Sequence, residues 1–247
     1  MTNDKEIWNN LLMIKTILFD LDGTLLPMDE EYFKKIYFGA VYKKIGYLGY
    51  TLDELLKVIW YGTKAMIKND GNQTNEEVFW KSFIEVHPDR LEENKENFVD
   101  FYDNIFPTLG HTCGYQPLAK EFIKRLKDKG YEVIIASNPI FPLVATKARI
   151  KWAGLDPDDF KHITAYENSH FCKPNPEYYK EILKKFDLKS EEVIMIGNDV
   201  REDMMVNAFG IDSYLITDCL LNPDNEDINK YKHGNFEEIM NLVLNKL

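Results

Sequence analysis

The sequence predicts an α/β protein: a doubly wound parallel sheet with a block of helices inserted after its first strand. Two observations indicate this fold. From Pro117 onward, apolar runs such as "VIIAS" and "VIMIG" alternate with amphipathic helical segments, the pattern of a parallel sheet covered on both faces. Between positions 28 and 110, helical spacing continues without a convincing strand, so we expect an all-helical inserted domain there.

The expected elements follow from apolar spacing and from breaks at Gly, Pro and Asn. The first strand is "TILFD", and helices should follow at 29–48, 51–69, 75–87 and 91–106. The remaining strands are expected at 131–138, 162–166, 191–199 and 213–217, with helices at 117–130, 141–154, 176–187, 201–210 and 235–247. The predicted core therefore comprises 13–27 and 111–247, and the predicted cap comprises 28–110.

Two predicted helices carry capping signals. Asn175 precedes a helix whose first residue is Pro176, and Asn235 stands three residues before Glu238, as in a capping box. These signals fix where the two helices should begin.

Composition excludes several classes of function. The 247 residues carry 30 basic and 41 acidic side chains, a net charge of −11 without a basic stretch, which argues against a nucleic-acid partner. No apolar run approaches the roughly 18 residues of a membrane span, and the N-terminus "MTNDKEIWNNLL" does not resemble a signal peptide. Cys113, Cys172 and Cys219 are far apart and odd in number, as expected for reduced thiols. We therefore expect a cytoplasmic protein, whose oligomeric state the sequence does not reveal.

Polar residues follow several predicted strands at the point where each one ends. Asp20 and Asp22 follow the first strand, Ser137 and Asn138 end the second, and a Gly-Asn-Asp sequence at 197–199 ends the fourth. Ligands collect at the carboxyl ends of strands in an open parallel sheet. We expect these residues to meet there, together with Lys173 and Asp203.

The residue types at this edge indicate a particular chemistry. Several carboxylates without a suitable His or Cys favour Mg²⁺ as counter-ion. One carboxylate could then attack a phosphate ester to form an acyl phosphate. Lys173 and Ser137 could hold the phosphoryl oxygens, and a carboxyl two residues beyond the nucleophile could transfer protons.

This constellation resembles the haloacid dehalogenase-like superfamily in its motifs and their order: "DLDGT", "SN" at Ser137, "KP" at Lys173 and "GNDVRED". The resemblance implies that Asp20 is the nucleophile, and that Asp22 is the general acid/base and a metal ligand through its backbone carbonyl. It also implies that Ser137 and Lys173 bind phosphate and that Asp199 and Asp203 hold magnesium. Gly23, Thr24 and Asn138 complete the motifs as further phosphate-binding candidates. The helical block is similar to the cap of members with an early insertion.

The fourth motif departs from the family's commoner form, which has aspartate directly after the glycine. Here that position is Asn198, and Asp199 follows. Either Asp199 binds the metal with the short spacing to Asp203, or Asn198 supplies a neutral carbonyl ligand. We prefer Asp199.

The sequence thus predicts a Mg²⁺-dependent phosphatase that acts on a small phosphorylated metabolite through an aspartyl phosphate. The resemblance implies that an acid at position 22 marks a phosphatase or a phosphomutase, since the family's dehalogenases have none there. A phosphosugar mutase and a non-catalytic phosphate-binding protein are the alternatives. We expect the two crossings between core and cap, at Pro27 and near Gly110 and Gly114, to form the cap's hinge. We expect Arg201 and Glu202 to lie on the surface.

Overall fold

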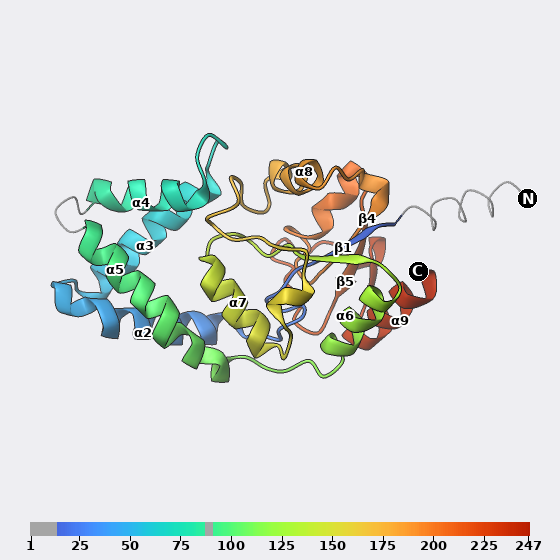
Figure 1. Cartoon of the computed structure of the whole chain (residues 1–247), viewed down its shortest axis with the longest axis horizontal. Coiled ribbons are helices and arrows are strands. Elements are labelled where there is room, and N and C mark those ends of the chain that lie inside the picture. The colour runs from blue at the N-terminus through green and yellow to red at the C-terminus, as the bar shows by residue number, and fades with distance from the viewer. Residues whose placement is uncertain (1–13, 87–90) are drawn as a thin grey trace, which may run out of the picture.

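The computed structural model describes residues 14–86 and 91–247, so the expected core boundary at Met13 and the end of the expected helix at His87 lie outside the described residues. The described residues contain one parallel sheet of six strands in the order β3-β2-β1-β4-β5-β6. The strands are β1 (Thr16–Phe19), β2 (Glu132–Ile135), β3 (His162–Ile163), β4 (Val193–Gly197), β5 (Asp212–Ile216) and β6 (Lys232–Gly234). The predicted doubly wound α/β core is confirmed (Figure 1).

Helices cover both faces of the sheet because successive strand residues point to opposite sides. Ile17 and Phe19 of β1 belong to the apolar core that contains α6 (Ala119–Asp128) and α9 (Phe236–Lys246). Leu18 belongs to a second core, which contains α8 (Pro176–Lys185). Both faces are therefore buried, as the continuous apolar strands predict.

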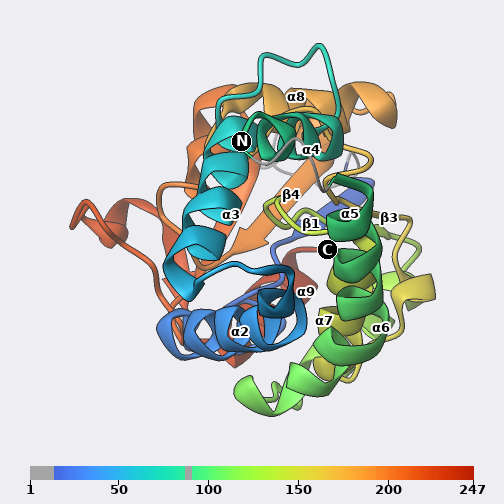
Figure 2. The same cartoon turned by 90° about the vertical axis from the view of Figure 1, so that its left-hand side faces the viewer.

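The segment between β1 and β2 is helical in its described part. It contains α2 (Glu30–Ile45), α3 (Leu52–Ile67), α4 (Asn75–Val86) and α5 (Leu91–Asp100), then a π-helix (Phe101–Ile105) and a 3₁₀ helix (Phe106–Thr112). We call this segment the helical insertion. Figure 2 looks through it onto β1 and β4. Its aromatic core also includes Ala145 and Ala148 of α7 (Leu143–Trp152), so the insertion packs on the sheet domain through α7.

Three core elements differ from the prediction. The third strand spans two residues instead of 162–166, and the expected helix at 201–210 is a 3₁₀ helix at Met204–Phe209 that ends at Gly210, where φ is +81°. Strand β6 was not expected, because "KHG" carries no apolar run. It lies at the sheet's edge, where one neighbour suffices for a short polar strand.

Both predicted helix caps are confirmed. The Asn175 side chain accepts a hydrogen bond from the N–H of Glu177 at the start of α8. Asn235 and Glu238 form a complete capping box at the start of α9. No helix among the described residues is long and apolar enough to cross a membrane.

Candidate active site

The register of the central strands brings the predicted site residues to one edge. Phe19, the last residue of β1, pairs with Ile135 of β2 and with Ile196 of β4. Asp20 therefore lies at the level of Ala136, which follows β2, and of Gly197, the last residue of β4. Asp20 continues the register, since its N–H donates to the carbonyl of Ile196 at 2.9 Å.

Lys173 joins two of the predicted carboxylates. Its Nζ lies 2.9 Å from Oδ1 of Asp20 and 2.6 Å from Oδ1 of Asp203. The Lys173 side chain is fully buried. Burial would lower the pKa of Lys173, but the two carboxylates raise it well above its usual value. Lys173 is therefore a charged ammonium beside the proposed nucleophile.

Burial also raises the pKa of Asp20, to about 6, against the opposing effect of Lys173. The neighbouring Asp203 carboxylate contributes to the raised pKa of Asp20. Two buried anions share one cation here, so additional positive charge would favour the ionised form of Asp20.

Thr24 and Asn198 form a bridge between the first and fourth motifs. The Thr24 hydroxyl lies 2.9 Å from Oδ1 of Asn198 and 3.3 Å from Oδ2 of Asp20. Asn198 Nδ2 donates to the carbonyl of Cys219 at 2.7 Å. A Cβ on Gly23 would lie 2.3 Å from that nitrogen, and Gly23 has a φ of +81°. Gly23, Thr24 and Asn198 thus shape the loop, and both ends of the Asn198 amide have protein partners.

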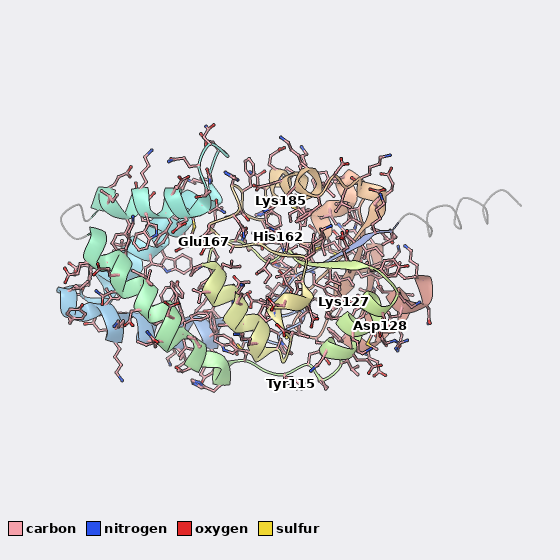
Figure 3. The ribbon with its side chains drawn as sticks, viewed as in Figure 1. Tyr115, Lys127, Asp128, His162, Glu167 and Lys185 are labelled. Carbon is pink, nitrogen blue, oxygen red and sulfur yellow. The ribbon has the colours of Figure 1, made fainter. Side chains whose placement is uncertain are left out.

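Asp22 pairs with a residue that sequence reasoning missed. Arg149, on α7, forms an ion pair with Oδ2 of Asp22 and donates to the Thr146 hydroxyl at 3.1 Å. The guanidinium also lies 4.6 Å from the ring centroid of Phe141. Glu167 accepts the N–H of Leu143 at the start of α7 and lies near that helix end (Figure 3). Arg149 thereby reaches Asp22 from a helix that is fixed at its N-terminus.

The other oxygen of Asp22 is placed differently. Oδ1 is buried and has no hydrogen-bond partner among the described residues. Burial raises the pKa of Asp22 to about 6, although Arg149 opposes the shift. A carboxyl group of this kind can hold a proton near neutral pH and give it up, as a general acid must.

Ser137 and Asn138 follow β2, as predicted. Both line the same cavity as Asp20. Asn138 Nδ2 lies 3.1 Å from Glu202 and 3.3 Å from the carbonyl of Lys173. The expectation that Glu202 lies on the surface is wrong: it lines the cavity, and burial raises its pKa to about 7. Arg201 is half-exposed and pairs with Asp224, as a surface residue does.

Asp199 is the remaining predicted metal ligand. Its Oδ1 accepts the N–H groups of Arg201 and Glu202 at 2.7 and 2.9 Å, and burial raises its pKa. Within residues 14–86 and 91–247, no three His, Cys, Asp or Glu side chains are grouped closely enough to form a metal site.

The ligand set that the sequence predicts comprises the carboxylates of Asp20, Asp199 and Asp203 with the backbone carbonyl of Asp22. In the structure, the Asp203 carboxylate instead bonds to Lys173 and to the N–H of Asp199. All donors of the predicted set are oxygens, and Asp20 and Asp199 line one cavity. The donor chemistry therefore fits Mg²⁺.

The site opens into a cavity of about 650 Å³. The carboxylates at the sheet edge line one part of it, and α2, α3 and α4 of the helical insertion line another. The volume is typical of pockets for small molecules. The cavity thus joins the candidate reaction centre to the insertion.

Two relatives carry names that state an activity. The chain is 22% identical over 205 residues to a phosphoglycolate phosphatase of Vibrio vulnificus, with 83% of this chain and 84% of the relative covered. It is 26% identical over 204 residues to the pyrophosphatase PpaX of Bacillus cereus, with 76% of each covered.

Solved structures share the fold. A 2-haloacid dehalogenase from Pseudomonas syringae has a TM-score of 0.64 at 15% identity, with 95% of this chain and all of the other covered. YfnB from Bacillus subtilis, described as a HAD-hydrolase bound to magnesium that shows interdomain movement, has a TM-score of 0.57 at 20% identity, with 94% and 99% covered. The model of haloacid dehalogenase-like hydrolases matches residues 14–210, so the chain belongs to that family.

Proposed function

We propose that this protein is a Mg²⁺-dependent phosphatase that hydrolyses a phosphate monoester through an aspartyl phosphate on Asp20. The observation that carries the proposal is the different environment of two neighbouring carboxylates. Asp20 is bound to Lys173, whereas Asp22 has one buried oxygen without a partner among the described residues. Such a pair suits a nucleophile and a proton donor. The names of the two relatives, both phosphatases, support the same reaction class.

In the first step, an Asp20 oxygen forms a bond to phosphorus while the bond to the leaving alcohol breaks. Asp22 gives its proton to the departing oxygen. In the second step, Asp22 takes a proton from water as that water attacks the phosphorus, and inorganic phosphate leaves. Asp20 is then restored as a carboxylate, so all atoms and protons balance over the cycle.

Lys173, Ser137 and Asn138 are proposed to bind the phosphoryl oxygens. The Asp20 and Asp199 carboxylates and the Asp22 backbone carbonyl would hold the Mg²⁺ ion, with Asp203 orienting Lys173. When bound, the ion would offset the charge of the carboxylates and the phosphate dianion, which otherwise repel each other. Positions 28–110 would serve as a cap that excludes water during the first step.

Release of phosphate from p-nitrophenyl phosphate tests the proposal, with and without EDTA. We expect EDTA to abolish activity and Mg²⁺ to restore it. Asp20→Asn should remove turnover. Asp22→Asn should reduce turnover of an alkyl ester such as ethyl phosphate by about 100-fold or more, the usual contribution of a general acid, because an alkoxide leaves poorly without a proton whereas p-nitrophenolate does not need one. Unchanged activity in Asp20→Asn would refute the mechanism. A long-lived phospho-enzyme would instead favour the mutase alternative.

A further inference from the structure

The part of the cavity that lies beyond the carboxylates is largely aromatic. Its walls come from the helical insertion and from the loops that follow β2 and β3. The aromatic residues that line it are Phe33, Tyr37, Phe38, Trp60, Phe79, Trp80, Phe98, Tyr102, Phe141 and Tyr166. This surface adjoins Asp20 and Asp22, where the leaving alcohol of a phosphate ester would lie.

These rings differ in their exposure. Most also belong to the insertion's own core, and Phe79 and Trp80 are 8% exposed. Trp60, by contrast, is 43% exposed, and its ring lies 5.8 Å from that of the half-buried Phe38. Packing within the insertion therefore does not account for Trp60, whose ring borders both the cavity and solvent.

The charges that line the cavity do not suit an anionic leaving group. Among the described lining residues, six are acidic and two are basic. Lys34 is paired with Glu30 at 2.8 Å, and Arg149 is paired with Asp22. A second carboxylate or phosphate on the substrate would meet Glu30 and the site carboxylates without an unpaired cation among these residues. Repulsion between like charges therefore disfavours the binding of a substrate with a second anionic group.

We propose that the substrate is the phosphate monoester of a bulky, uncharged aromatic alcohol, whose ring occupies the aromatic part of the cavity beside Trp60. The proposal rests on the phosphatase function proposed above and narrows its substrate class. Aromatic rings pack favourably edge-to-face or offset against one another. A cavity of about 650 Å³ exceeds what a glycolate group would fill. The protein would thus differ in substrate from the phosphoglycolate phosphatase and the pyrophosphatase that it resembles.

The test compares kcat/KM for alkyl phosphates whose leaving alcohols have similar acidity, so that chemical reactivity does not decide the outcome. The substrates are 2-naphthylmethyl phosphate, cyclohexylmethyl phosphate and ethyl phosphate, with 2-phosphoglycolate and pyrophosphate as anionic comparisons. We expect 2-naphthylmethyl phosphate to exceed ethyl phosphate and both anionic compounds by about tenfold or more, which corresponds to about 1.4 kcal/mol. Cyclohexylmethyl phosphate should fall between them.

Two adjacent residues of α3 provide matched variants. Trp60 lines the cavity, whereas Tyr61 is 48% exposed, is not among the described lining residues and bonds to Glu85. Trp60→Ala should lower the preference for the naphthylmethyl ester severalfold while turnover of ethyl phosphate persists. Tyr61→Ala should keep the preference of the wild type.

The outcomes separate the two proposals. If p-nitrophenyl phosphate is hydrolysed but phosphoglycolate, pyrophosphate or ethyl phosphate matches the naphthylmethyl ester, the substrate inference is wrong and the phosphatase stands. Equal effects of Trp60→Ala and Tyr61→Ala would also overturn it. If no ester is hydrolysed, p-nitrophenyl phosphate included, the proposed function itself fails and the inference fails with it.

Discussion

Arg149 of α7 forms a partly buried ion pair with Asp22, and the two residues are 127 positions apart in the sequence. The Arg149 side chain is 2% exposed and that of Asp22 is 22% exposed. The guanidinium occupies Oδ2 of Asp22, while the buried Oδ1 has no hydrogen-bond partner among the described residues. We therefore assign Arg149 as a positioning residue for the proposed general acid.

Arg149→Met should raise the pKa of Asp22, since burial already raises it and the nearest cation would be lost. In the pH profile of kcat/KM, the limb that reports the titration of Asp22 should shift to higher pH by about one unit or more. A shift of this size is the usual effect of removing an adjacent opposite charge. Arg149→Lys keeps the charge and should restore part of the shift. A profile that only loses amplitude in Arg149→Met would indicate a purely structural role.

The choice between Asn198 and Asp199 as metal ligand can be tested with adjacent variants. Both ends of the Asn198 amide bond to protein atoms, at Thr24 and Cys219. Asp199→Asn should therefore raise the Mg²⁺ concentration for half-maximal activity by about tenfold or more. Asn198→Ala should lower the stability of the fold or the turnover number, with a smaller effect on the Mg²⁺ concentration for half-maximal activity. The reverse pattern would make Asn198 the ligand.

The sequence predicts the strands of the α/β core and its motif residues better than it predicts which side chains contact them, and the reasons are physical. Apolar runs with a strict order define the parallel strands, and D-x-D at a strand end marks Asp20 and Asp22 without any structural knowledge. Arg149 could not be found this way, because it stands between Lys147 and Lys151 in an ordinary helical pattern. Only the packing of α7 against the insertion determines which of these cations becomes buried.

Glu202 and β6 were missed for related reasons. Glu202 follows Arg201, and the two acquire opposite surroundings because the chain from 201 to 203 forms turns instead of the expected helix. The pairing of β6 with β5 depends on backbone hydrogen bonds, which do not require an apolar sequence. Which aromatic residues of the insertion line the cavity depends on how its helices cross, and spacing along the sequence does not show that.

His162 should make stability depend on pH. Burial and the nearby Lys185 lower the pKa of His162 to about 4, and Lys185 Nζ lies 3.4 Å from its Nε2 (Figure 3). The unfolded chain protonates this histidine from about pH 6.5, so it binds more protons than the folded protein between pH 6.5 and 4. The free energy of unfolding should therefore fall as the pH is lowered through this window.

We expect a loss of about 1–2 kcal/mol from this residue, after allowance for its partial exposure. Urea unfolding at pH 7, 6 and 5 would measure it as the difference between wild type and His162→Gln, which cancels the titration of the site carboxylates. His233 is exposed on β6, so His233→Gln is the matched control. Parallel pH profiles for wild type and His162→Gln would contradict the assignment.

The proposed hinge lies where the chain leaves and re-enters the core. Met28 and Cys113 form an isolated antiparallel bridge there, and the N–H of Gly114 donates to the carbonyl of Pro27 at 2.8 Å. A Cβ on Gly110 would lie 2.7 Å from Cδ1 of Trp152, and one on Gly114 would lie 3.0 Å from Cβ of Pro27. Large substitutions at these glycines would therefore disturb packing as well as motion.

A reversible cross-link avoids that ambiguity. The bond from Gly114 to Pro27 flanks the Met28–Cys113 pair in the manner of a non-hydrogen-bonded antiparallel pair, whose Cα atoms lie about 4.5 Å apart. That separation falls within the range of disulfides. Met28→Cys should thus allow a disulfide to Cys113 that ties the two crossings together. If the cap must open and close in each cycle, oxidation should lower kcat for p-nitrophenyl phosphate, and reduction should restore it.

The Mg²⁺ requirement should stay the same in both states, because the proposed ligands follow β1 and β4 and lie outside the cap. Wild type treated with the same oxidant controls for the other cysteines, and a thiol count verifies the cross-link. Equal turnover of the cross-linked and reduced forms would show that these crossings are not the hinge, and a matching loss of Mg²⁺ affinity would show that the cross-link distorts the core instead of holding the cap.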